Sequence, residues 1–155
     1  MNEEISKLIE EFEARLKSLK DEYEEDKAEC EFGKGDFCWV ISESGSLTGS
    51  AWRGDEYNED CYEQGNVFKT REEALFEVEK RKVLHELKQL GREFILDHDN
   101  WFFYLKGNQE IDCTAYQNIQ FLHGSLYFDT EGELWKAIYT VGLQRIKKYL
   151  FGIEE

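Results

Sequence analysis

The sequence has no proline among its 155 residues. Without proline, no loop is held at a fixed φ, and no helix is ended by a residue that lacks an N–H group. Helix ends and turns must therefore come from the 12 glycines or from tertiary contacts. We expect glycine to mark the turns of this chain.

Long apolar runs are also absent. No stretch approaches the roughly 18–20 apolar residues that a membrane-spanning helix needs. Residues 1–26 alternate charged and apolar side chains and lack the continuous apolar segment of a signal peptide. These absences argue against membrane and secreted proteins, and we therefore expect a cytoplasmic protein.

Cysteine is scarce, and its spacing fits neither a metal site nor a disulfide framework. The chain contains no C-x-x-C pair, and its four cysteines are Cys30, Cys38, Cys61 and Cys113. In a reducing compartment they are expected as free thiols. Cys38 and Cys113 fall in strand-like runs, where we expect them to be small core residues.

Motifs for catalysis and cofactor binding are missing as well. In Asp97-His98-Asp99 two carboxylates flank an imidazole, as in general base catalysis, but no nucleophile lies nearby in the sequence. A polar turn is the better interpretation. His85 and His123 lack a second ligand at i+3 or i+4, and no glycine loop leads into a helix. We expect no enzymatic activity, no metal and no cofactor.

Positive charge is in deficit, because 34 Asp and Glu residues outnumber 19 Lys and Arg residues and leave a net charge of −15. Such a charge repels phosphates and argues against nucleic acid as a direct partner. The net negative charge is sufficient to keep a protein soluble, and it would also allow the protein to bind a basic surface as a decoy. Residues 79–92 differ, because their net charge of +3 can pair with another copy or with an anionic ligand.

One nine-residue segment occurs twice. Residues 67–75 return as residues 127–135 at an offset of 60, with Phe68, Thr70 and Glu73 matched by Phe128, Thr130 and Glu133. The Thr-x-x-Glu spacing is that of a capping box, which predicts a helix start in each copy. An aromatic run precedes each copy, so the sequence predicts two similar units at 31–92 and 93–155.

Residues 1–30 form a separate segment, in which residues 3–29 are predicted as one amphipathic helix. Apolar side chains recur mostly at steps of three and four, at Ile5, Leu8, Ile9, Phe12, Leu16, Leu19 and Tyr23. The stripe is narrow, as in a coiled coil. Either the helix lies across the domain, or it is a dimerisation arm that gives a homodimer.

In the first unit we expect a hairpin of strands 36–41 and 50–53 around a turn at 42–49. Residues 53–64 are acidic and are interpreted as a loop or weak edge strand. A short extended segment then ends at Phe68, and a helix capped by Thr70 runs to Leu90 and stops at Gly91.

The second unit repeats this plan. Strands are predicted at 101–106 and 109–116 around a Gly107-Asn108 turn. The last helix is capped by Asp129 or Thr130, buries Leu134, Ile138 and Val141, and is interrupted at Gly142. The expected fold class is α+β: a long N-terminal helix followed by two tandem antiparallel β-meander-plus-helix repeats.

Two sets of residues are candidates for binding. The 53–63 segment displays carboxylates and tyrosines suited to a protein partner, namely Asp55, Glu56, Tyr57, Glu59, Asp60, Tyr62 and Glu63. Trp39, Arg53 and Trp101 are candidates for stacking on a small ligand between the units. Residues 101–104 put large rings on both faces of one strand, which is either central or a binding platform.

The segments 65–74, 127–130 and 141–152 resemble a known group. They are similar to the small accessory proteins of phages and prophages of Gram-positive bacteria, which pair this repeat with an N-terminal helix. The resemblance covers residues 30–155 and implies a mobile-element gene that acts in the cytoplasm of a bacterial host. Many such genes encode inhibitors of host defence, including anti-CRISPR proteins. The resemblance assigns no binding or catalytic residue.

The function expected from these features is non-enzymatic. Acidic surfaces of a phage or prophage protein would act as a nucleic-acid mimic that blocks a nucleic-acid-binding defence protein of the host. The N-terminal helix and the 53–63 segment would carry most contacts. The alternative is a protein that sequesters a nucleotide or another small signalling molecule between the repeats.

Overall fold

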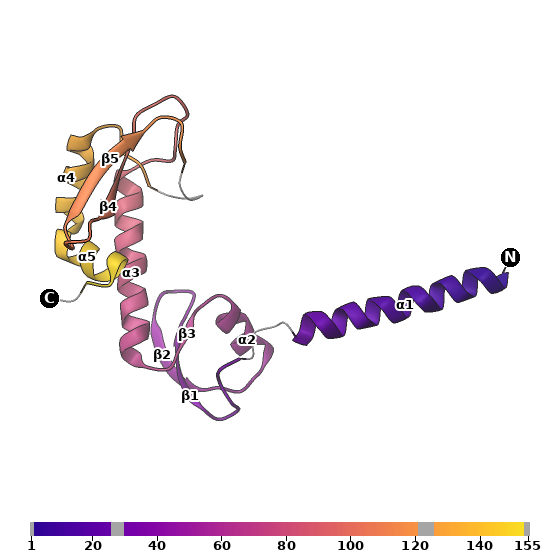
Figure 1. The fold of residues 1–155 in the computed structure, drawn as a ribbon. Helices are drawn as coiled ribbons and strands as arrows, with labels where there is room; N and C mark the ends of the chain where they lie inside the picture. Colours follow the sequence, from indigo (N-terminus) through magenta and orange to yellow (C-terminus); the bar gives the residue numbers. More distant parts are fainter. Residues whose placement is uncertain (1, 26–29, 121–125, 154–155) are drawn as a thin grey trace.

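The computed structural model describes residues 2–25, 30–120 and 126–153. Over these residues the chain is a mixed α+β protein with five helices and two small antiparallel sheets. One sheet lies at each end of the long central helix α3 (Arg71–Leu90), as Figure 1 shows. The fold class is therefore α+β, as the sequence predicts.

Helix α1 (Asn2–Glu25) extends away from the rest of the molecule (Figure 1). Its apolar side chains stay exposed, with exposed fractions between 43% at Leu16 and 68% at Phe12. The interpretation in which this helix lies across the domain is therefore wrong. The end of the predicted helix, residues 26–29, lies outside the described residues.

The first sheet has the strand order β2–β1–β3 and is antiparallel throughout. It consists of β1 (Phe37–Ile41), β2 (Leu47–Ala51) and β3 (Val67–Phe68). β2 begins three residues earlier than predicted, because Ser42 donates its N–H to the carbonyl of Ser46 and closes the turn early. The core of this half is built from Phe32, Cys38, Val40, Trp52, Cys61 and Val67.

Residues 56–63 form helix α2 (Glu56–Glu63), so the prediction of a loop or edge strand there is wrong. The Asp55 side chain accepts the backbone N–H of Asn58 at 3.0 Å and caps the first turn. Asn58 and Cys61, one turn apart, are buried. A helical period therefore fits this segment better than an extended one.

Helix α3 begins at the predicted capping box and ends at the predicted glycine. Thr70 accepts the N–H of Glu73 at 3.2 Å, and Glu73 accepts the N–H of Thr70 at 3.0 Å. Gly91 follows the last helical residue at φ −109°, which any residue adopts. A Cβ at this position would lie 2.9 Å from the carbonyl oxygen of Tyr127. Glycine is needed here for a close approach of two chain segments, and not for a left-handed cap.

The second half packs a hairpin and two helices on the other end of α3. The hairpin joins β4 (Asn100–Leu105) and β5 (Ile111–Tyr116), and the helices are α4 (Glu131–Val141) and α5 (Leu143–Phe151). Gly142 separates the helices at φ +106°, as the sequence predicts. The predicted stripe of α4 is confirmed, since Leu134, Ile138 and Val141 are buried with Val83, Leu87, Phe128 and Ile146.

One local prediction in this half is corrected, and one pair of alternatives is decided. The turn between β4 and β5 spans 106–110 and is closed by the Lys106 N–H donating to the Glu110 carbonyl, so Gly107-Asn108 is only part of it. Thr130 caps α4 by accepting the Glu133 N–H at 3.1 Å, whereas Asp129 pairs with Arg92.

Candidate protein-interaction surface

Helix α2 presents an acidic face to solvent. Its exposed carboxylates are Glu56, Glu59, Asp60 and Glu63. Their spacing of i, i+3, i+4 and i+7 places all four on one side of the helix. At 1.5 Å per residue they span about 10 Å along the helix axis. We call these four residues the α2 acidic face.

The α2 acidic face is held in place by the core beneath it. Asn58 is buried, and its Oδ1 accepts the N–H of Arg53 at 2.7 Å. The ring of Tyr62 lies 6.1 Å from Phe32 and 6.0 Å from Trp52, in edge contacts. Of the predicted partner-binding residues, Asp55 and Tyr62 are therefore structural, as the helix cap and as a core contact.

Within the described part of the chain, no cation lies within ion-pair distance of Glu56, Glu59 or Asp60. Arg53, the nearest cation in sequence, pairs with Asp55 at 3.0 Å. Tyr57 lies beside the acidic face with 54% of its surface exposed. Its pKa is raised, chiefly by a hydrogen bond with Cys61, so the hydroxyl stays protonated at neutral pH.

Most cations of the basic segment 79–92 are paired with carboxylates of the chain. Arg81 pairs with Glu77 at 2.9 Å, and Lys82 pairs with Glu79 at 2.6 Å. From α5, Arg145 reaches back to α3 and donates to both carboxylate oxygens of Glu86, at 2.9 and 3.0 Å. The hydrogen bond with Arg145 lowers the pKa of Glu86. These pairs occupy individual side chains but do not cancel the net positive charge of the segment, because Glu79 belongs to the segment and Arg145 brings a further cation to Glu86.

The predicted stacking residues do not come together. Trp39 lies on β1, where the guanidinium of Arg71 sits 5.8 Å from its ring centre. Trp101 lies on β4, at the other end of α3, and packs on the core of the second half (Figure 1). The side chain of Arg53 forms an ion pair with Asp55. These three residues do not form one site.

The aromatic strand β4 has rings packed on both of its faces. Trp101 and Phe103 pack on the core. On the other face, the Phe102 ring stacks on Tyr116 at 5.9 Å and meets Tyr127 edge-on at 6.2 Å. The strand also pairs on both sides, with β5 along its length and with Phe128 at Trp101. Because it pairs on both sides, β4 is a central strand, but Tyr104 and the neighbouring Tyr116 of β5 on its outer face are exposed by 37% and 42%, so the binding-platform interpretation of that face stays a prediction.

The described surface contains two open hollows. One, of about 790 Å³, lies between the turn at 41–45 and the α3 residues Val78, Arg81, Lys82, His85 and Glu86. The other, of about 660 Å³, has Phe68 and Phe76 among its lining and carboxylates of Glu31, Glu72, Glu73 and Glu77 beside Lys69. Both fall in the size range of small-molecule sites.

The Asp97-His98-Asp99 segment is a turn, as predicted, and it is organised by a buried asparagine. Asn100 Nδ2 donates to the carbonyls of Ile95, His98 and Tyr116 at 2.8, 2.7 and 3.1 Å. Its Oδ1 accepts from Ile95 N–H at 3.0 Å. The His98 ring contacts the carbonyl of Leu96 at 3.3 Å, so neither flanking carboxylate is seen to orient it.

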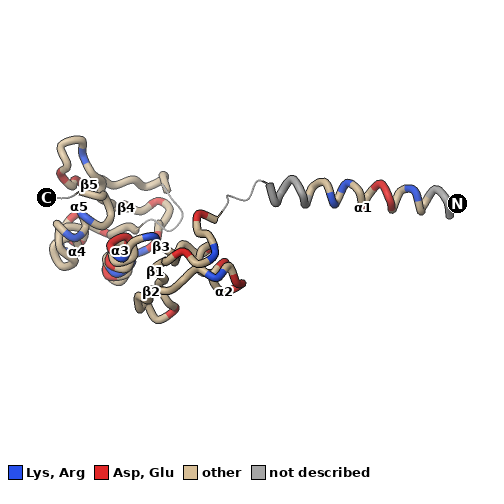
Figure 2. Tube along the Cα trace, turned by 90° about the horizontal axis from the view of Figure 1, so that it is seen from below, with Lys and Arg blue, Asp and Glu red and all other residues tan. Residues whose placement is uncertain are grey.

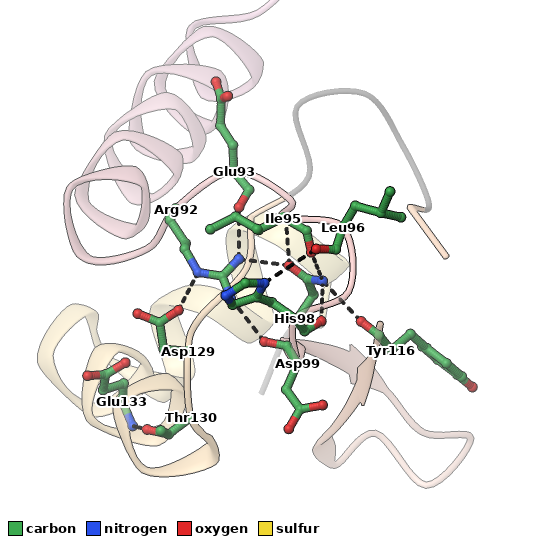
Figure 3. Close-up of polar contacts among 11 residues, drawn as sticks. Arg92, Glu93, Ile95, Leu96, His98, Asp99, Tyr116, Asp129, Thr130 and Glu133 are labelled. Atoms are coloured by element: carbon green, nitrogen blue, oxygen red, sulfur yellow. Dashed lines mark hydrogen bonds and ion pairs between the residues drawn. The ribbon is translucent and has the colours of Figure 1, made fainter. Parts of the chain in front are cut away.

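Arg92 joins this turn to the cap of α4, as Figure 3 shows. Its guanidinium donates to Asn100 Oδ1 at 2.7 Å and to the carbonyls of Glu93 and Asp99 at 2.9 and 3.0 Å, and it pairs with Asp129. The sequence did not reveal this network, because the burial of an asparagine depends on tertiary packing. The polar atoms of Asn100 and Arg92 are occupied, which favours a structural role.

Two other features are absent from the described residues, a metal-binding cluster and a membrane-spanning helix. No group of three or more His, Cys, Asp or Glu side chains there is placed to hold a metal ion. None of the helices that the structure describes is long and apolar enough to cross a membrane. His123 lies outside the described residues.

Comparison with protein-family models, curated proteins and solved structures finds no match to this chain.

Proposed function

We propose that this chain is a non-enzymatic protein of a phage or prophage that binds a basic, nucleic-acid-binding defence protein in the cytoplasm of a bacterial host and blocks it, as anti-CRISPR proteins do. The α2 acidic face carries this proposal. It is a row of exposed carboxylates fixed on a helix that the core holds in place.

The spacing of these carboxylates supports mimicry of nucleic acid. Four carboxylates over about 10 Å of helix axis give a mean interval of about 3.5 Å. One strand of duplex DNA carries a charge every 3.4 Å of its axis, roughly. A groove lined with Lys and Arg to receive phosphates would therefore meet a similar linear charge density on α2. The net charge of −15 adds long-range attraction to such a groove.

We also infer that the two halves are tandem repeats. In each half the first hairpin strand pairs with the segment before a Thr-capped helix, through Trp39 with Phe68 and Trp101 with Phe128. Both Thr70 and Thr130 accept the N–H of a Glu three residues later. Because these contacts occur in both halves, they support a scaffold role for the residues that make them. Among the described residues, helix α2 occurs in one half only, which supports a binding role for it.

A nucleotide or another small signalling molecule is the second candidate ligand. The hollow between the turn at 41–45 and α3 supports it, because hydroxyls of Ser42 and Ser44 lie there with Lys82 and His85. Binding of an anionic ligand in this hollow would weaken with salt, as binding of an acidic decoy would, so removal of the α2 carboxylates separates the two candidates: it should change only the capture of a protein partner.

A capture experiment tests the proposed function. The tagged chain is incubated with nuclease-treated lysate of a Gram-positive bacterium, and stoichiometric partners are identified by mass spectrometry. We expect one nucleic-acid-handling protein. Replacing Glu56→Gln, Glu59→Gln and Asp60→Asn together should reduce its capture at least tenfold, because the charges that face the groove are gone.

The matched control carries Glu72→Gln, Glu93→Gln and Glu110→Gln, which remove the same charge from exposed sites away from α2. Its capture should equal that of the unaltered chain. Equal loss in both variants would mean that net charge alone acts, and no loss in either would remove α2 from the interface.

A further inference from the structure

Helix α1 carries an apolar seam that nothing in the described chain covers. Ile5, Ile9, Phe12, Leu16 and Leu19 follow one another at steps of four, three, four and three. These steps are the d and a positions of a heptad, with Ile9 and Leu16 at a. All five side chains are exposed, by 43% at Leu16 to 68% at Phe12.

We expect a second helix to cover an exposed apolar seam of this kind. A helix without tertiary packing is marginal in water, and a strict 3.5-residue repeat keeps its apolar side toward one neighbour along the whole length. A second copy of the chain supplies the same seam. The question is whether two copies meet in the same or in opposite directions.

The charges of α1 favour one relative direction of the two helices over the other. Glu10, Glu11 and Glu13 form an acidic block, and Arg15 and Lys17 form a basic block directly after it. Figure 2 shows these blocks in turn along the helix. Side by side in the same direction, two copies would place acidic on acidic and basic on basic. In opposite directions, the acidic block of each copy faces the basic block of the other.

We propose that two copies of this chain pair through α1 as an antiparallel coiled coil centred on residue 14. In this register Ile9 packs on Leu19 of the second copy, and Phe12 packs on Leu16. On one flank Arg15 lies within a turn of Glu11 of the second copy, and on the other Glu10 and Glu13 lie within a turn of Lys17. The register also brings Glu13 near Glu13 and Arg15 near Arg15 of the second copy, but the opposite-charge neighbours outnumber these two like-charge ones. A register one heptad earlier would be centred between Glu10 and Glu11 and would oppose like charges.

The net negative charge of residues 32–155, the folded body of each copy, also favours the antiparallel pair. Residues 1–31 hold −7 of the net charge of −15, which leaves −8 on residues 32–155. An antiparallel pair separates the two bodies by the length of α1, about 36 Å for 24 residues. That distance exceeds three Debye lengths of about 10 Å at 0.1 M salt. Parallel helices would hold both bodies at one end.

This pairing goes beyond the proposed function, because it uses α1 and leaves the α2 acidic face open in each copy. A dimer would present two such faces at opposite ends of a rod. Capture of a defence protein and pairing of α1 are therefore tested by separate experiments, and each can fail without the other.

The test is disulfide trapping in the intact chain with the exposed Cys30 replaced, Cys30→Ser. Chains with Ile9→Cys and chains with Leu19→Cys are mixed, oxidised with copper phenanthroline and run on a non-reducing gel. We expect a covalent dimer in the mixture at least fivefold above that of either chain alone. Ala14→Cys, on the side of α1 away from the seam, is the matched control and should not be trapped.

Two results would overturn the antiparallel pair. Leu19→Cys alone would be trapped as efficiently as the mixture if the helices were parallel, because equal positions would then be neighbours. A mass of 18.4 kDa for the unaltered chain by light scattering at about 100 µM would show a monomer.

Discussion

At the scale of single residues, the buried side chain of Asn100 is the centre of the polar contacts around the 92–99 turn. Its side chain is fully buried, and it serves three carbonyls, one N–H and the guanidinium of Arg92. Buried polar groups that lose a partner cost about 1–3 kcal/mol each. This residue therefore fixes the 92–99 turn against β5.

Asn100→Leu should lower the free energy of unfolding by about 2–4 kcal/mol, because three carbonyls and a guanidinium lose their partner together. Urea denaturation followed by tryptophan fluorescence measures the change. Gln89→Leu, an exposed position at the end of α3, is the control and should change the free energy of unfolding by less than about 0.5 kcal/mol. Equal stability of the two variants would contradict the structural role of Asn100.

Gly91 gives a second prediction at this scale. Gly91→Ala should cost about 1–3 kcal/mol, since the new Cβ would meet Leu126 at 2.5 Å and the Tyr127 carbonyl oxygen at 2.9 Å. The control is Gly107→Ala, where nothing lies within 4 Å of the added Cβ. Thermal unfolding by circular dichroism compares the two. A cost at Gly107 as large as that at Gly91 would mean that close approach is not the cause.

At the scale of elements, the sequence predicted the helix ends that depend on neighbouring residues. It did not predict the element that depends on tertiary packing. The capping box at Thr70, the side-chain cap at Thr130 and the break at Gly142 depend on neighbours a few residues away, so the sequence reveals them. Helix α2 was missed because its outward residues are acidic, as in a loop. Its helical state depends on the burial of Asn58, which accepts the N–H of Arg53, and of Cys61, which packs in the core with Phe32 and Trp52.

The candidate site shows the same division. The sequence identifies the carboxylates of the 53–63 segment, but only the helix aligns four of them on one face. Trp39, Arg53 and Trp101 were predicted to hold a small ligand between the two units. The 20 residues of α3 separate those units by a rise of about 30 Å. Residues in two similar sequence segments are therefore not brought together by that similarity.

The contact between α3 and α5 should depend on pH. The hydrogen bond from Arg145 lowers the pKa of Glu86 below its ordinary value of 4.5. A carboxyl with a lowered folded pKa stabilises the fold fully above its unfolded pKa, and this contribution is lost as pH falls through the folded pKa. Both side chains are more than one third exposed, so the effect is small.

Glu86→Gln should therefore destabilise the protein at pH 7, and the difference from the unaltered chain should shrink as pH falls through the lowered pKa of Glu86. Urea denaturation across this pH range measures it, and Glu93→Gln, which has no ion pair in the described structure, is the control. A difference that grows as pH falls would contradict the assignment of Arg145 as the partner.

At the scale of the whole molecule, the folded body and α1 are separate units of stability. The four tryptophans all lie in the body, at positions 39, 52, 101 and 135. Phe12→Glu with Leu16→Glu should leave their fluorescence unfolding curve unchanged, because α1 contributes nothing to either core. The same variant should be a monomer by light scattering. A loss of body stability would show that α1 packs on the body in solution.

The charge distribution of the whole molecule gives the central claim, that the α2 acidic face replaces nucleic acid in a basic groove. The most direct measurement is the affinity of the chain for its captured partner between 50 and 200 mM salt, with and without competing nucleic acid. We expect steep weakening with salt, displacement of the chain by nucleic acid, and a shallower salt dependence after Glu56→Gln, Glu59→Gln and Asp60→Asn. Salt-independent binding that leaves the partner's nucleic acid in place would contradict mimicry.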